Sequence, residues 1–382
     1  MMRYYIAVAS LFAAASVLGI SPAHASARAL DYTELSLEQL MQVEITSVAK
    51  RPASVLDSPA AVYVLTNEDI RRSGARSIPE ALRFVPGLNV ARTSSSGWAI
   101  SARGDNSSFA NKLQVMIDGR SIYTPLFSGV FWDRHDTLLE DIERIEIIRG
   151  PGASLWGANA VNGVINVITK NAKDTQGTYL SAGYGTGDEV QGSARYGGTA
   201  GRNGHYRVYG KALYEGAEQA IDGGDGADDW LSARGGFRVD ATGPEGDVWQ
   251  LQGASFGSEV GSAGILPSLS APYSSTQELE TDVYGQYALA SWSRELSETN
   301  KIEVRGYVQR TTFEDDRLRE ERNIIDLEAD QNLTVADRHQ IVWGIGARYS
   351  NDNIRETDIY RFGDADDSQY LVNGFFQDTM SF

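Results

Sequence analysis

The stretch RGPGASLWGANAVNGVINVITK, from Arg149 to Lys170, is the most informative part of the 382-residue chain. It begins as a short strand, passes through a compact loop rich in Gly, Ala and Asn, and ends in the apolar run Val164–Thr169. The glycines of this stretch permit backbone conformations and close approaches that a side chain would block. They are Gly150, Gly152, Gly157 and Gly163. The stretch therefore predicts a tight strand–loop–strand unit.

The residues before this unit predict a small domain that mixes helices and strands. Thr66 precedes NEDIRRSG and has Asp69 three residues later, and Ser77 precedes IPEALRFVPG, so both segments begin like capped helices. Gly74 and Gly87 stand where these helices should end. Five segments have the character of strands: Ala61–Leu65, Leu88–Arg92, Leu113–Ile117, Arg144–Ile148 and Val164–Thr169. We expect an α+β domain over residues 51–175.

The pattern changes near Gly177, after which alternating apolar and polar segments are separated by clusters of turn residues. Ten strands are expected: Thr178–Tyr184, Glu189–Tyr196, His205–Tyr214, Trp230–Asp240, Val248–Phe256, Asp282–Arg294, Lys301–Phe313, Arg322–Leu333, Gln340–Tyr349 and Tyr370–Phe382. The longer separators are residues 215–229, 257–281, 314–321 and 350–369. Short turns alternating with long loops, with Tyr and Trp near the strand ends, are typical of a transmembrane β-barrel. A soluble β-sandwich is the alternative.

A second stretch, RGDNSSFANKLQVMIDGRSIYTPLFSGVFW, runs from Arg103 to Trp132. Together with the first, it resembles the plug domain of TonB-dependent outer-membrane receptors, and the resemblance extends from about Leu35 to Lys170. It implies an α+β plug domain followed by antiparallel transmembrane β-barrel strands. Receptors with a plug have 22 strands, whereas residues 176–382 supply about ten.

The size of the plug indicates that these ten strands do not form a complete barrel. A compact domain of about 120 residues is roughly 35 Å across. A ten-stranded barrel is only about 20 Å across, and a 22-stranded one is about 44 Å across. We therefore expect an incomplete barrel, with the chain being a fragment, a truncated gene product or an incomplete sequence.

Residues 1–25 predict a secretory signal peptide. Arg3 precedes the apolar run Tyr4–Ile20, and Ala23-His24-Ala25 forms a small-x-small cleavage site before Ser26. An uncleaved membrane anchor is the alternative. No later apolar run in the sequence is long enough for a transmembrane helix, so entry into a membrane requires strands. We expect export through the periplasm to the outer membrane of a Gram-negative cell, where lipopolysaccharide would surround the protein.

The composition excludes several classes of function. The formal charge is −17, from 34 basic and 51 acidic residues, which argues against nucleic acid as a partner. The chain has no Cys, and its four His are scattered, so we expect neither an enzyme, nor a cofactor, nor a bound metal. The acidic segment Asp222–Asp229 is expected to be a solvated outer loop, with a cation or lipid-headgroup site as the alternative.

Residues 26–50 are expected to contain the element that couples the receptor to its energy source. The candidate is a short, alternating, β-branched run. It comprises Glu44, Ile45, Thr46, Ser47, Val48 and Ala49. The resemblance implies that this segment pairs as an added strand with periplasmic TonB, the partner that relays energy from the inner membrane. An ordinary first strand of the plug is the alternative.

The resemblance also implies two further sets of site residues. Arg103 and Arg149 would face carboxylates of the barrel wall and hold the plug in place, with a solvated turn arginine as the alternative for each. Five aromatic side chains on outward loops of the plug could stack on a flat organic ligand, with packing inside the plug as the alternative. They are Trp98, Tyr123, Phe127, Phe131 and Trp132.

The function implied by the resemblance is import of a scarce solute that is too large for porins. An iron–siderophore is the favoured solute, and cobalamin, haem and oligosaccharide are the alternatives. A truncated receptor remnant that binds partners without transport is a further hypothesis, because the expected barrel is incomplete.

Overall fold

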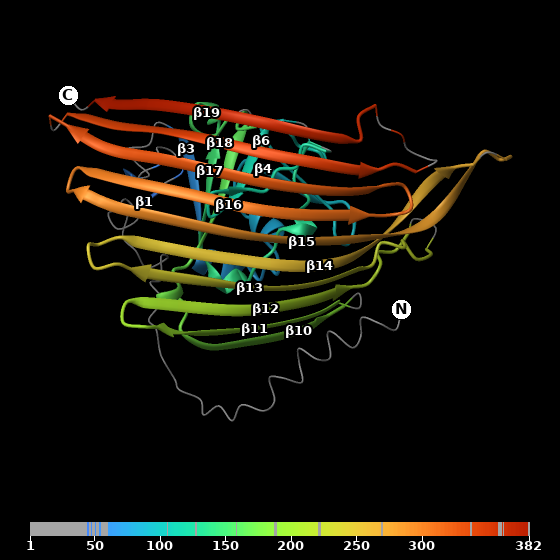
Figure 1. The fold of residues 1–382 in the computed structure, drawn as a ribbon. Coiled ribbons are helices and arrows are strands. Elements are labelled where there is room, and N and C mark those ends of the chain that lie inside the picture. The colour runs from blue at the N-terminus through green and yellow to red at the C-terminus, as the bar shows by residue number, and fades with distance from the viewer. Residues whose placement is uncertain are drawn as a thin grey trace.

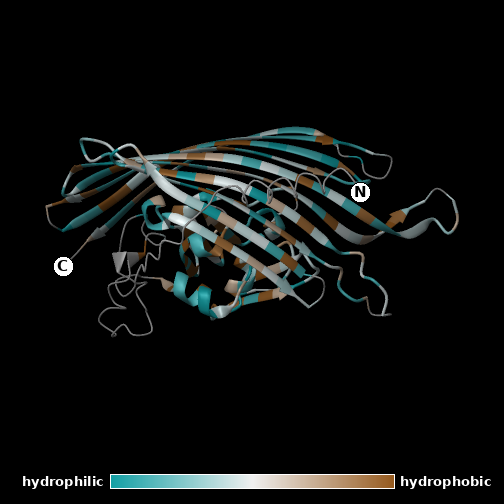
Figure 2. Cartoon of the chain, turned by 90° about the horizontal axis from the view of Figure 1, so that it is seen from below, coloured by the Kyte–Doolittle hydropathy of each residue, from teal (hydrophilic) through white to brown (hydrophobic). Residues whose placement is uncertain are grey.

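The computed structural model describes residues 44–45, 47, 50, 53–54, 60–104, 106–126, 128–157, 159–186, 189–220, 223–268, 270–336, 338–357, 361 and 363–380. In this part of the chain, a small α+β domain lies inside the curve of a ten-stranded antiparallel sheet (Figure 1). Figure 2 shows the sheet arching over this domain. The predicted signal peptide lies outside the described residues.

The small domain, called the plug below, is built around a five-stranded sheet with the order β3-β8-β9-β6-β7. These strands are β3 (Ala61–Thr66), β6 (Leu113–Ile117), β7 (Arg120–Ser121), β8 (Ile142–Arg149) and β9 (Gly163–Thr169). Two separate hairpins pair β1 (Glu44–Ile45) with β2 (Ala53–Ser54) and β4 (Leu88–Arg92) with β5 (Trp98–Ala102). The helices are α3 (Asn67–Ser73), α4 (Ile78–Leu82), α5 (Ala153–Trp156), η2 (Trp132–Arg134), η3 (Leu139–Asp141) and η4 (Ala172–Thr175).

Helix α3 begins and ends as the sequence predicts. The Asp69 backbone N–H donates to the Thr66 hydroxyl at 3.1 Å, the Thr66 N–H donates to the Asp69 carboxylate at 2.9 Å, and Gly74 ends the helix with φ of 70°. Helix α4 is shorter than expected. It ends at Leu82 rather than near Gly87, because Val85 N–H already bonds back to the Leu82 carbonyl in a tight turn at 3.1 Å.

The plug core is formed by apolar side chains of its sheet and helices. Ile145 and Ile147 of β8 and Ile165 and Val167 of β9 are completely buried. The sheet is close-packed where β9 begins, since a Cβ atom at Gly163 would lie 2.5 Å from the Ile148 carbonyl oxygen. Position 163 therefore requires glycine, because the backbone of β8 approaches it closely.

Replacing Gly163 with Ala should destabilise the plug by about 1–3 kcal/mol, because the added methyl group overlaps the backbone of β8. Urea unfolding of the purified chain measures the change. Gly104→Ala is the matched control, since its Cβ would lie 3.3 Å from the end of the Asn162 side chain and 3.9 Å from the nearest backbone atom, the Ala102 carbonyl oxygen. Equal stability of the two variants would contradict the close approach.

The large sheet contains all ten strands that the sequence predicts, and each strand pairs with the next along the chain. They are β10 (Gly177–Gly185), β11 (Glu189–Ala200), β12 (Gly204–Glu215), β13 (Trp230–Thr242), β14 (Val248–Pro267), β15 (Ser274–Ser297), β16 (Asn300–Glu314), β17 (Arg319–Val335), β18 (His339–Arg355) and β19 (Asp366–Met380). Within the described residues, β10 and β19 each pair with one strand, so the sheet is open, as the strand count predicts.

The expectation that residues 257–281 form a loop is wrong. Instead, β14 and β15 remain paired as far as Pro267 and Ser274, and their hairpin extends beyond the neighbouring strands (Figure 1). The extension is rich in Gly and Ser, which are typical of turns and loops, and this composition led to the wrong expectation. None of the described helices is long and apolar enough to cross a lipid bilayer.

Candidate coupling site and plug–sheet interface

The predicted coupling segment contacts the plug through Ser47. The Ser47 N–H donates to the Glu146 carboxylate at 2.8 Å, and the Asn166 side-chain amide donates to the Ser47 hydroxyl at 3.0 Å. The Trp156 indole N–H donates to the Ser47 carbonyl oxygen at 2.6 Å. Ser47 and Ile45 are fully buried. The three residues that bond to Ser47, namely Glu146, Asn166 and Trp156, are called the Ser47 cradle below.

The cradle was missed by the sequence interpretation, although it left a signal. Glu146 and Asn166 are polar residues inside the apolar strands IERIEIIR and GVINVIT. A buried carboxylate or amide needs hydrogen-bonding partners. Ser47 is a partner of both side chains, and the Arg144 guanidinium also donates to Glu146, at 2.8 Å. Glu44 and Ile45 form β1, and Ser47 lies in a turn, while Thr46, Val48 and Ala49 lie outside the described residues.

Lys50 connects the same segment to the large sheet. Its ammonium group pairs with Glu328 of β17 and lies 3.5 Å from the Asp330 carboxylate. It also lies 5.0 Å from the Trp156 ring centre and 4.3 Å from that of Phe375. The Lys50 side chain is 5% exposed, and its φ of 49° is unusual for a residue other than glycine. The segment is thus held from both sides, by the plug and by the sheet.

Ion pairs across the plug–sheet interface use residues other than those predicted. Asp141 of the plug pairs with Arg195 of β11 and, at 3.3 Å, with Arg207 of β12. Asp136 pairs with Lys211 of β12 at 2.5 Å. In these two cases the carboxylate belongs to the plug and the cation to the sheet, whereas Arg76 with Glu189 and Arg92 with Glu215 have the expected polarity, with the arginine on the plug.

Arg103 and Arg149 make no ion pair with the described strands of the large sheet. Arg103 is exposed and has a φ of 51°, and Arg149 donates to the Pro86 carbonyl oxygen within the plug at 3.0 Å. Their contact with a barrel carboxylate stays a prediction.

The five aromatic residues expected to face a ligand do not form one surface. Trp98 and Trp132 differ from the expectation, because they are only 7% and 6% exposed and pack in the plug core. Tyr123 and Phe131 are half-buried, and the Arg134 guanidinium lies 3.8 Å from the Phe131 ring centre. Phe127 lies outside the described residues. A ligand contact stays a prediction for Tyr123 and Phe131.

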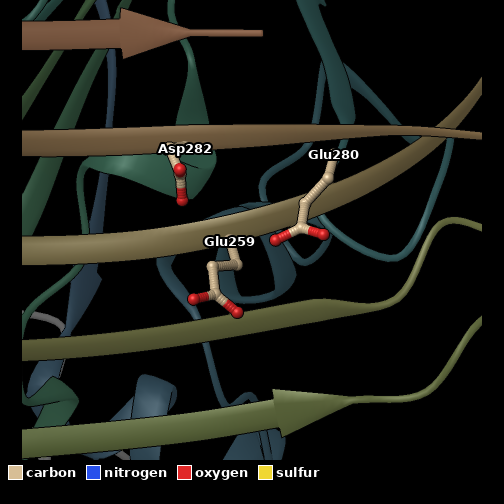
Figure 3. A group of neighbouring side chains, drawn as sticks. All are labelled: Glu259, Glu280 and Asp282. Carbon is tan, nitrogen blue, oxygen red and sulfur yellow. The ribbon is translucent and has the colours of Figure 1, made fainter. Parts of the chain in front are cut away.

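Among the described residues, three acidic side chains gather on β14 and β15. Oxygen atoms of Glu259, Glu280 and Asp282 lie within 4.8 Å of one another (Figure 3). Within the acidic segment, the Asp228 carboxylate accepts the Ser95 N–H at 2.8 Å instead. This loop therefore contacts the plug hairpin β4–β5.

The two faces of the large sheet differ in polarity. On β13, Arg234 and Arg238 are buried toward the plug, whereas Phe237 between them is exposed on the opposite face. The same face carries exposed large apolar side chains on other strands. Examples are Leu180, Val190, Val208, Leu251, Tyr284, Val308, Ile325, Leu327, Trp343 and Ile345. A polar inner face and an apolar outer face are typical of outer-membrane strands.

His135 lies at the plug–sheet interface among three guanidinium groups. Burial holds the pKa of this imidazole well below its ordinary value, and the charges of Arg120, Arg234 and Arg134 act in the same direction. The folded protein therefore keeps His135 neutral at pH values where the unfolded chain takes up a proton.

Below about pH 6.5, protonation of His135 in the unfolded chain should therefore lower the free energy of unfolding by up to about 1.4 kcal/mol per pH unit. The stabilisation is fully present above that pH and decreases as the unfolded imidazole becomes protonated. Urea unfolding at pH 7.5 and 5.5 should show a smaller difference in His135→Asn than in the wild type. His205→Asn, in β12, is the control, and an unchanged difference in His135→Asn would contradict the assignment.

Comparison with known proteins defines the class. Residues 54–164 match the family model of the TonB-dependent receptor plug domain. The chain thus carries the plug domain of TonB-dependent receptors, followed by strands with the fold of their barrel, as the sequence predicts.

Particular relatives include transport receptors. The chain is 32% identical over 181 residues to the vitamin B12 transporter BtuB of Vibrio cholerae. The aligned segment covers 47% of this chain and 29% of the relative. It is 30% identical over 187 residues to the ferric enterobactin receptor PirA of Pseudomonas aeruginosa, covering 45% of this chain and 24% of the relative.

Solved structures of receptors share the fold. The siderophore receptor PirA of Pseudomonas aeruginosa has a TM-score of 0.61 at 18% identity, covering 85% of this chain and 53% of that protein. The ferric-catecholate import receptor Fiu of E. coli has a TM-score of 0.63 at 16% identity, covering 82% of this chain and 49% of that protein. The chain therefore spans about half the length of these solved receptors.

Proposed function

We propose that the protein acts in the outer membrane as a TonB-dependent receptor that imports a scarce solute with energy relayed by TonB. The observation that carries this proposal is the placement of the coupling segment. Ser47 and Lys50 connect one segment to both the plug and the large sheet. A pull on this segment would act on the cradle and on Lys50 before it acts on the rest of the plug.

The outer face of the sheet supports the location in the membrane. Its exposed apolar side chains would face lipid, and lipopolysaccharide would contact the outer ends of the strands. The buried charged residues face the plug, where carboxylates compensate several of them. The signal peptide of residues 1–25 would direct the chain through the periplasm.

The proposed solute is a ferric siderophore, with cobalamin as the second candidate. Relatives named for ferric enterobactin and for vitamin B12 support these two classes. Both are large, scarce metal complexes, so one uptake mechanism serves either of them. Haem and oligosaccharide have no comparable support among these relatives.

Accumulation of labelled ferric catecholate and labelled cyanocobalamin tests the proposal in cells with and without TonB. The expected result is TonB-dependent accumulation of one solute in cells that carry the receptor gene. A binding-only remnant is the alternative, and it predicts solute bound at the surface without accumulation. Accumulation that is equal without TonB would overturn the proposal.

A further inference from the structure

Two buried guanidinium groups line one cavity between the plug and the large sheet. Arg120 of β7 is 3% exposed, and Arg234 of β13 is 8% exposed. The cavity has a volume of about 20 Å³ and is also lined by Asp118, Asp136 and Arg207, among others. It lies away from residues 44–50, and its lining residues come from both the plug and the large sheet.

Arg120 and Arg234 have no carboxylate partner among the described residues. Arg120 donates to the Gln309 side-chain oxygen at 2.7 Å and lies 3.9 Å from the Tyr287 ring centre. Arg234 donates to the Arg134 carbonyl oxygen at 2.6 Å and lies 4.6 Å from the Phe256 ring centre. None of these four contacts supplies a negative charge to compensate either guanidinium group.

Other charged residues around the cavity are paired. Arg238 bonds to both oxygens of the Asp240 carboxylate, at 2.8 and 2.9 Å. Asp136 pairs with Lys211 at 2.5 Å. Asp118 accepts bonds from the Thr169 N–H and the Gln252 amide, at 2.8 and 2.9 Å, and its carboxylate lies 3.9 Å from Arg238 Nη1. The uncompensated charge therefore belongs to Arg120 and Arg234.

The cavity lining also contains a hydrogen-bond donor without an acceptor. The Nε atom of Arg120 is buried and has no hydrogen-bonding partner in the described part of the chain, whereas the Nε atom of Arg207 lies 3.3 Å from the Asp141 carboxylate. Burial lowers the pKa of Arg120 below its ordinary value, and the nearby Arg234 charge lowers it further. An unpaired charge in a buried site is strongly unfavourable, so the site requires a counter-charge.

We propose that this cavity binds a small monovalent anion of the size of chloride, held between Arg120 of the plug and Arg234 of the sheet. A volume of about 20 Å³ accommodates one small ion or water molecule and excludes sulfate or phosphate. The anion compensates one unit of the positive charge that Arg120 and Arg234 bring to the cavity lining. It therefore bridges the plug to β13.

A water molecule is the competing occupant, because the Asp136 Oδ1 atom in the same cavity also has no hydrogen-bonding partner among the described residues. Crystals of the full chain soaked in sodium bromide distinguish the two occupants. Bound bromide gives an anomalous peak within hydrogen-bonding distance of Arg120 Nε. Absence of the peak at molar bromide identifies water and overturns the proposal.

Thermal unfolding gives a second test that needs no crystal. At constant ionic strength, replacing gluconate with chloride should raise the unfolding midpoint of the wild type progressively, whereas sulfate should not. Arg234→Met should lose this chloride dependence. Arg310→Met, which removes a half-exposed arginine paired with Glu321, should keep it. Equal chloride dependence in both variants would exclude Arg234 as a ligand.

Discussion

A receptor carrying Ser47→Pro should bind its solute at the cell surface at the wild-type level and fail to accumulate it. Proline removes the backbone N–H that donates to Glu146 and that an added strand needs for pairing with TonB. In the described part of the chain, Ser47 bonds to Glu146, Asn166 and Trp156 and not to Tyr123 or Phe131, so binding should survive. Binding and accumulation of labelled solute in the same cells measure both effects.

Ser47→Ala is the matched control, because it keeps the N–H and removes only the hydroxyl contact with Asn166. It should accumulate solute nearly as the wild type does. Ile45→Pro should behave like Ser47→Pro, since both residues are buried in the same segment. If both proline variants accumulate solute normally, residues 44–49 are only a part of the plug fold.

Replacing Asp141 with Ala should destabilise the association of plug and sheet by about 3–5 kcal/mol. Asp141 is 1% exposed, and its removal leaves Arg195 and Arg207 without this buried carboxylate. Each guanidinium would then keep its desolvation cost without its compensating charge. Urea unfolding of the purified chain, followed by tryptophan fluorescence and by proteolysis of the plug, measures the loss.

Asp174→Ala is the control for this variant, because Asp174 is an exposed carboxylate of the nearby helix η4. It should change the free energy of unfolding by less than about 0.5 kcal/mol. A similarly small effect of Asp141→Ala would show that the ion pairs with β11 and β12 do not hold the plug.

Much of the fold can be predicted from the sequence, because it depends on local patterns. The capping residues Thr66 and Asp69 define the start of α3, and alternation defines the ten strands of the large sheet. The extended hairpin of β14 and β15 was not predicted, since its outer part is rich in Gly and Ser, residues that are typical of turns and loops. Its pairing is fixed by the register with the inner part of the same strands.

The site was less predictable, because its contacts join residues that are distant in the sequence. Glu146 and Asn166 reach Ser47 across 99 and 119 positions. Asp141 was not recognised as an interface residue, because its partners lie in another domain. Trp98 and Trp132 show the opposite error, since an aromatic residue in a loop can equally belong to the core.

Binding of the periplasmic domain of TonB to the purified chain tests the central claim, that residues 44–49 form the coupling site, most directly. Calorimetry should show saturable binding to the wild type and none to Ser47→Pro. Trp156→Phe removes one hydrogen bond to the Ser47 carbonyl oxygen, about 1 kcal/mol, and should bind TonB about fivefold more tightly. Trp132→Phe, a plug variant away from Ser47, should match the wild type. Equal TonB binding by the wild type and Ser47→Pro would contradict the account.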